Sequence, residues 1–216
     1  MLDAIYWDGD TAAANYSMKN ISDYARRPSP RSARARAEQA LDICVEGIWN
    51  NARAKAGSLS STILRLSQLS SPRDTSLLAS TGVFCAEILR ATASVAQGKS
   101  NVTREVAALD SLLATGPPVM REIRHAGNLE LARIYEKLGQ AALALRAVRR
   151  RAYFNGDLAF LPTALREEGR LARLTGDRAG AIRAYQRYLA LRSDPEPGLV
   201  NQTQEVRREL ATLLHE

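Results

Sequence analysis

The 216-residue sequence predicts an all-α protein built from repeated helical hairpins. Long segments are filled with strong helix formers such as Ala, Leu, Arg, Glu and Gln, and no clear strand run interrupts them. Helix-breaking residues recur about every 40 residues, at Gly9, Asn51, Gly98, Gly139 and Gly176. Two helices per period of this length are typical of a helical solenoid, in which stacked hairpins bury faces that none could bury alone.

Looser Pro- or Ser-rich connections alternate with these turns and divide one domain, residues 1–216, into units. We expect an incomplete first unit in 1–27, degenerate repeats in 28–115, the two clearest units in 118–192, and a turn with a capping helix in 193–216. Only about eight residues precede the first glycine turn, too few for most of a first helix. This favours a fragment of a longer protein or a chain that a partner caps; an independent protein with an incomplete first repeat is the alternative.

Apolar residues recur at helical spacing along these units. One stripe is formed by Leu131, Ile134, Tyr135 and Leu138, and another by Ile182, Tyr185 and Leu189. The last segment carries Val206, Leu210 and Leu213 at i, i+4 and i+7, as expected of an amphipathic helix that covers the final hairpin.

The unit that begins near Pro162 has the clearest pattern of small and large residues. Small residues at Gly169, Ala172 and Ala181 let its two helices approach closely, and Tyr185 is expected to fill the space beyond them. Leu189 and Leu191 are expected to seal the hairpin against the next element.

The turn of the same unit contains Gly176 and Asp177. The glycine can take the left-handed conformation that ends a helix, and the aspartate can cap the helix that follows.

The pattern of Gly169, Gly176, Ala181 and Tyr185 resembles the tetratricopeptide repeat (TPR), and Ala132, Tyr135, Gly139 and Ala144 fit a second unit. Tyr188 departs from the family, which prefers alanine there. The resemblance implies a right-handed superhelix of about five hairpins, partly degenerate, plus a C-terminal capping helix. Residues 129–215 also resemble the C-terminal repeat regions of bacterial signalling proteins, in which a kinase or transcription-activator domain precedes the repeats.

The net charge of +7 is spread evenly, with +3 on residues 1–108 and +4 on residues 109–216. Dedicated nucleic-acid proteins more often gather their cations on one face or arm, so nucleic-acid binding is the alternative. No apolar run is long enough to span a membrane and no secretory signal is evident, which predicts a cytoplasmic protein without membrane contact.

No catalytic constellation is evident, so we expect no enzyme, no cofactor and no metal. His125 and His215 lack metal-ligand partners at helical spacing, and Asp8 and Asp10 fit a turn better than a calcium loop. Cys44 and Cys85 lie in apolar helical runs and are expected to pack as small buried residues.

A polar stripe on the helix after Pro162 is the candidate binding site. Arg166, Arg170 and Arg173 follow at i, i+4 and i+7, with Thr163 one turn earlier, and Arg133 takes the equivalent place in the preceding unit. In TPR proteins the resembling positions line the concave groove. Guanidinium groups suit carboxylates, so the expected ligand is an acidic peptide or a peptide C-terminus. The alternative is a solvated face balanced by Glu130, Glu167 and Glu168.

Two further basic clusters are candidates for RNA contact. One surrounds the Pro28/Pro30 connection and the other, Arg146 to Arg151, ends a helix, where cations also suit the helix dipole. The segment Tyr153–Pro162 is expected to pack Phe154, Phe160 and Leu161 over a hairpin junction, with a partner contact as the alternative. Taken together, these patterns predict a non-catalytic protein- or peptide-binding scaffold, and the resemblance implies that it is the sensory arm of a bacterial signalling or regulatory protein.

Overall fold

The computed structural model describes residues 11–28, 32–52, 62–66, 79–98, 100–116, 121–150 and 161–215. In these ranges the protein is all-helical and contains no strand, which confirms the predicted all-α class. Its helices are α2 (Thr11–Ala25), α3 (Ala33–Ala52), α5 (Ala79–Ala96), α6 (Val102–Thr115), α7 (Arg121–Lys137), α8 (Ala141–Arg149), α9 (Leu161–Leu174), α10 (Arg178–Leu191), the short η2 (Pro197–Leu199) and α11 (Val200–His215). The expected turn at Gly9 and the aromatic residues Phe154 and Phe160 lie outside the described residues.

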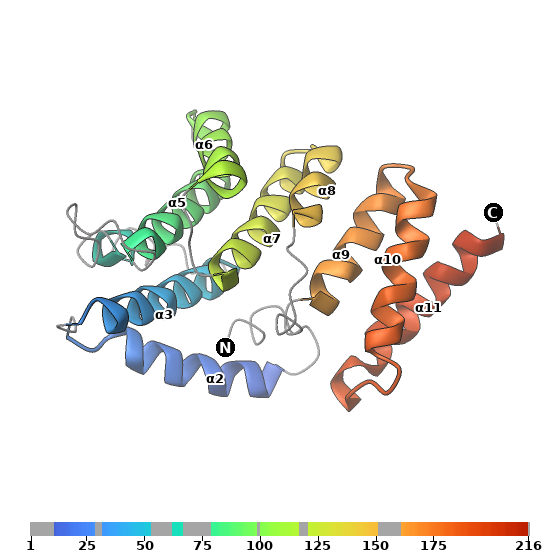
Figure 1. The fold of residues 1–216 in the computed structure, drawn as a ribbon, viewed down its shortest axis with the longest axis horizontal. Helices are drawn as coiled ribbons and strands as arrows, with labels where there is room; N and C mark the ends of the chain where they lie inside the picture. The colour runs from blue at the N-terminus through green and yellow to red at the C-terminus, as the bar shows by residue number, and fades with distance from the viewer. Residues whose placement is uncertain are drawn as a thin grey trace.

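The helices pack mainly against elements that are close in the chain. The pairs α5–α6, α7–α8 and α9–α10 follow one another across the molecule, and α11 packs on α10 (Figure 1). Helix α5 also contacts α3 and α7, and α8 contacts α9. The buried apolar side chains of the described residues form one continuous core that runs from Met18 to Leu213.

Three of the predicted glycine turns are confirmed. Gly98, Gly139 and Gly176 separate the helices of the three pairs, with φ angles of 59°, 73° and 78°. This left-handed region is open to glycine without steric cost, which is why the helices end there. The predicted cap is also present, because the Asp177 side chain accepts a hydrogen bond of 2.9 Å from the backbone N–H of Gly180.

The close approach of α9 and α10 depends on Gly169, as predicted. A Cβ atom at this position would collide with the ring of Tyr185, which is only 1% exposed. Ala172 and Ala181 are fully buried in the same contact. Tyr188, where the TPR pattern prefers alanine, is buried as well, and its hydroxyl donates to Gln202 on α11.

Two predicted core positions are wrong. Leu138 is 38% exposed and Leu191 is 42% exposed, although Tyr135 and Leu189 on the same stripes pack against the core. Leu138 follows the last residue of α7 and Leu191 is the last residue of α10, so both lie at helix ends where little of the next element covers them. The Asn50–Asn51 pair lies in the last turn of α3, which ends at Ala52, and not in a connection between helices.

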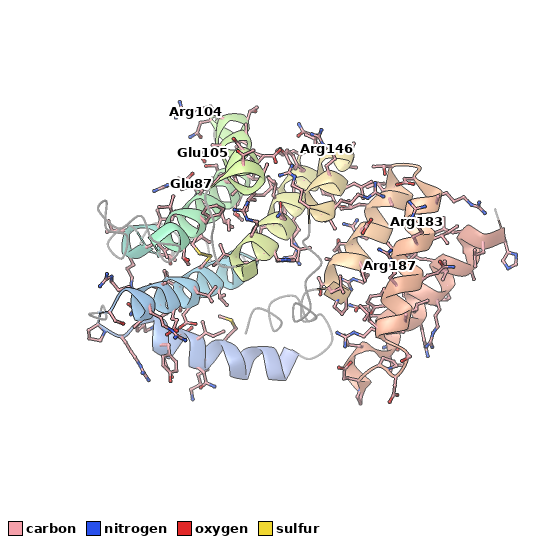
Figure 2. The ribbon with its side chains drawn as sticks, in the orientation of Figure 1. Glu87, Arg104, Glu105, Arg146, Arg183 and Arg187 are labelled. Atoms are coloured by element: carbon pink, nitrogen blue, oxygen red, sulfur yellow. A yellow bond between two sulfur atoms is a disulfide. The ribbon has the colours of Figure 1, made fainter. Side chains whose placement is uncertain are left out.

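Cys44 and Cys85 are buried, as predicted, but they are also joined by a disulfide between α3 and α5 (Figure 2). Their Cα atoms are 5.3 Å apart. Disulfides are uncommon in reducing compartments, so this bond is unexpected for the cytoplasmic protein that the sequence predicts. No helix in the described ranges is both long and apolar enough to cross a lipid bilayer.

Candidate functional site

The predicted arginine stripe runs along α9, and Arg170 links it to α7. The guanidinium of Arg170 donates to both carboxylate oxygens of Glu136, at 2.6 Å each, and also to Glu167 at 2.9 Å. The hydrogen bond from Arg170 lowers the pKa of Glu136 below its ordinary value, with a further contribution from the charge of Arg133. Arg133 and Arg170 therefore share one acidic neighbour across two hairpins.

Each arginine of the stripe has a carboxylate partner. Arg133 pairs with Glu130 at 2.7 Å and Arg166 with Glu167 at 3.2 Å. Thr163 is half-buried one turn before Arg166. The four arginines thus face four glutamates, so the charge of the stripe is largely compensated from within the protein, as in the alternative interpretation of this face.

Arg173 is separated from the rest of the stripe. Its side chain is 53% exposed and lies 3.6 Å from Glu209 on α11, which also accepts a hydrogen bond from Tyr185. Burial, followed by the hydrogen bond to Glu209, raises the pKa of Tyr185. Arg173 and Tyr185 together tie the last hairpin to α11, leaving Arg173 the most accessible cation of the predicted set.

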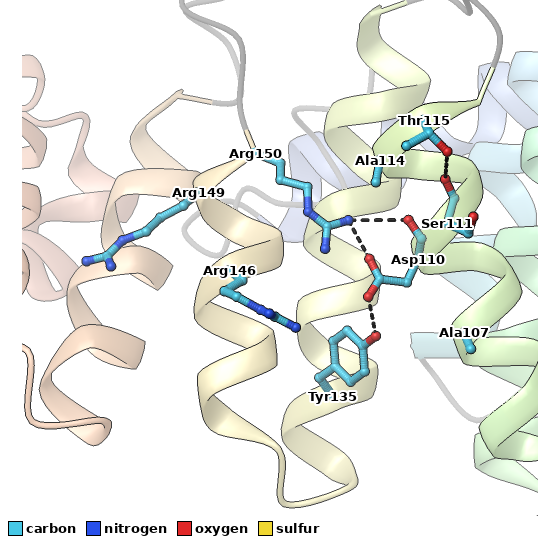
Figure 3. Close-up of a pocket in the computed structure, with 9 residues that line it drawn as sticks. All are labelled: Ala107, Asp110, Ser111, Ala114, Thr115, Tyr135, Arg146, Arg149 and Arg150. Carbon is cyan, nitrogen blue, oxygen red and sulfur yellow. Dashed lines mark hydrogen bonds and ion pairs between the residues drawn. The ribbon is translucent and has the colours of Figure 1, made fainter.

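A second group of polar residues lies in an open hollow between α6 and α8, where the structure adds Asp110 and Tyr135, which sequence reasoning missed, to the predicted basic cluster at the end of α8. Asp110 on α6 forms an ion pair of 2.5 Å with Arg150 and accepts a hydrogen bond of 2.5 Å from the hydroxyl of Tyr135 on α7 (Figure 3). Burial raises the pKa of Asp110, but the hydrogen bonds from Arg150 and Tyr135 outweigh it and the pKa falls below its ordinary value. Burial and the bond to Asp110 raise the pKa of Tyr135 to about 12.

The basic residues at the end of α8 do not all belong to this hollow. The guanidinium of Arg149 points away from Asp110 and binds Glu168 at 3.0 Å and Asp177 at 2.5 Å, so it fastens α8 to the next hairpin (Figure 3). Arg151 lies outside the described residues. Arg146 is exposed and forms no hydrogen bond or ion pair within the described part of the chain, although its charge contributes to the lowered pKa of Asp110. The spacing of Arg146 and Arg150 at i and i+4 was the available signal for this site.

The N-terminal basic cluster is partly compensated. Arg26 lies 3.6 Å from Glu46 and Arg34 lies 2.9 Å from Glu38. The guanidinium of Arg27 stacks 3.8 Å from the ring centre of Tyr24, which is 52% exposed. Arg31 lies outside the described residues.

The described residues contain no group of His, Cys, Asp or Glu side chains that could hold a metal ion. Their polar clusters are arginine–carboxylate pairs, which can bind and orient charged groups. Compared with known proteins, the chain matches no protein-family model, and no curated protein or solved structure is significantly similar to it.

Proposed function

We propose that the protein is a non-catalytic scaffold of the TPR-like, right-handed superhelical type, and that it binds acidic protein segments. The observation that carries the proposal is the repetition of one design. Three consecutive hairpins turn on a glycine with positive φ, and each packs against the next in chain order. Stacked hairpins of this kind offer an extended surface rather than an enclosed site, and such surfaces serve binding.

The charge of the protein supports an acidic ligand. The sequence carries a net charge of +7, and the face formed by Arg133, Thr163, Arg166, Arg170 and Arg173 presents guanidinium groups that can donate paired hydrogen bonds to carboxylates. Because these arginines already form ion pairs with glutamates of the protein, an acidic segment has to displace those glutamates to bind. Exchange is easiest at Arg173, whose contact with Glu209 is long, and at Arg133, whose partner lies in its own helix.

The test measures binding of a fluorescent glutamate-rich peptide to the full chain. Replacing Arg133 and Arg173 by Gln should weaken binding at least about tenfold, since hydrogen bonds to charged groups contribute about 1.5–3 kcal/mol. The control replaces Arg183 on α10 and Arg208 on α11, both exposed, by Gln. It removes the same charge elsewhere and should leave the affinity within twofold. Equal loss in both double variants, or no saturable binding, would refute the proposal.

Nucleic-acid binding is the alternative, and the stacked pair of Tyr24 and Arg27 favours it. An exposed aromatic ring beside a cation can stack on an unpaired base. This function predicts binding of a single-stranded oligonucleotide that weakens steeply with salt and that Tyr24→Ala reduces. Binding that is unchanged in Tyr24→Ala would exclude a specific role for this pair.

A further inference from the structure

We propose that the hollow between α6 and α8 binds an oxyanion, a carboxylate or a phosphate group, and that Arg146 is its anchoring residue. The hollow measures about 740 Å³ and is open to solvent. Its walls are Ala107, Asp110, Ser111, Ala114 and Thr115 from α6, Tyr135 from α7, and Arg146, Arg149 and Arg150 from the end of α8. It is separate from the α7–α9 stripe and does not depend on the function proposed above.

The charge of the hollow is not balanced from within. Arg146 and Arg150 reach from successive turns of α8 toward α6, whereas Arg149 points to the opposite side (Figure 3). The carboxylate of Asp110 is engaged on both oxygens, one by Arg150 and the other by Tyr135. One carboxylate thus faces two guanidinium groups, and the positive charge that remains is that of Arg146.

The arrangement around Arg146 is held in place by its neighbours. Arg150 donates a second, longer bond of 3.4 Å to the backbone carbonyl of Asp110, and Tyr135 is buried, so the floor of the hollow is fixed by three helices. The Ser111 side chain on the facing wall is exposed and offers a hydroxyl donor. The planar guanidinium fork of Arg146 matches the geometry of a carboxylate or phosphate, whereas a cation would be repelled and a neutral group would gain little.

A helix-dipole role is the competing explanation for Arg146. Cations near a helix C-terminus stabilise the helix slightly without binding any ligand. That role predicts a small loss of stability and no loss of anion binding when Arg146 is replaced, so the two explanations give opposite results in one experiment.

The experiment titrates inorganic phosphate into the isotope-labelled full chain at constant ionic strength and follows the Arg146 Nε–H and Ser111 amide signals by NMR. Saturable shifts of both signals are expected. Arg146→Gln should weaken phosphate binding at least about tenfold, because it removes a charged hydrogen-bond donor. Arg104→Gln, an exposed arginine near the start of α6 (Figure 2), is the matched control and should leave binding within twofold. Linear, unsaturated shifts, or equal loss in both variants, would overturn the proposal.

A second comparison identifies the source of the oxyanion. Capped phosphoserine and capped glutamate are titrated in the same way. Tighter binding of phosphoserine would assign the site to phosphate groups, and tighter binding of glutamate would assign it to acidic side chains. Failure of both to shift Arg146 would refute the site, whatever the glutamate-rich peptide does at Arg133 and Arg173.

Discussion

Arg170 on α9 holds the carboxylate of Glu136 on α7 by two hydrogen bonds of equal length, 2.6 Å each. The two residues are 34 positions apart and belong to consecutive hairpins. The pair therefore helps to fix how one hairpin lies on the next, and this contributes to the stability of the protein.

Breaking this pair should lower the stability of the protein. Both side chains are about one-third exposed, so we expect a coupling free energy of about 1 kcal/mol between Arg170→Gln and Glu136→Gln in a double-mutant cycle. The measurement is urea unfolding at neutral pH. The pKa of Glu136 is lowered in the folded protein, so its contribution is present above its ordinary pKa and is lost as the pH falls through the folded value. A coupling that stays constant into acid would contradict this assignment.

Replacing Gly169 by Ala should destabilise the protein by at least about 2 kcal/mol, because the added methyl group overlaps the buried ring of Tyr185. The helix propensity of alanine offsets less than half of this cost. The control is the same substitution in a Tyr185→Leu background, where the smaller side chain leaves room and the cost of Gly169→Ala should shrink. An equal cost in both backgrounds would show that the ring is not the obstacle.

Reducing the disulfide should lower the free energy of unfolding by about 4 kcal/mol, the value expected from loop entropy for cysteines 41 residues apart. The measurement compares urea unfolding with and without dithiothreitol. The Cys44→Ala/Cys85→Ala double variant serves as the control and should show no response to the reductant. Identical unfolding curves for the parent protein under both conditions would mean that the bond is not formed in solution.

Asp42 should make stability depend on pH in the direction opposite to Glu136. Burial, with a smaller contribution from the charge of Glu38, raises the pKa of Asp42 to about 6. The unfolded state releases this proton more readily, so stability is greatest below the ordinary pKa of Asp and falls as the pH rises toward 6. Asp42→Asn should add about 2–3 kcal/mol at pH 7 and almost nothing at pH 4. Thermal unfolding of the parent and of Asp42→Asn across this pH range tests the prediction. Glu38→Gln, at an exposed position, is the comparison and should have a smaller effect.

Local features of the fold could be predicted because single residues determine them. A left-handed turn needs glycine, which identified Gly98, Gly139 and Gly176, and a short polar residue at a helix start identified the Asp177 cap. The contact of Gly169 with Tyr185 followed from small and large residues at complementary helical positions.

Features that depend on the register between helices could not be predicted. The spacing of Arg166 and Arg170 places them on one face, but the partner Glu136 of Arg170 is known only once the two hairpins are stacked. The same holds for Asp110, Tyr135 and Arg150, which three helices bring together, and for the pairing of Cys44 with Cys85. The apolar pattern of a helix also continues to its end, where neighbouring helices cover little of it, and Leu138 and Leu191 are exposed for this reason.

The packing of each helix on its neighbours in the chain has a consequence for folding kinetics. Native contacts of this kind close short loops, so little chain entropy is lost before the first hairpins gain stability, and rapid folding follows. Unfolding need not involve the whole chain at once. The disulfide joins α3 to α5, while α11 packs mainly on α10 and η2, so detachment is expected to begin at the C-terminal helix and to advance one hairpin at a time.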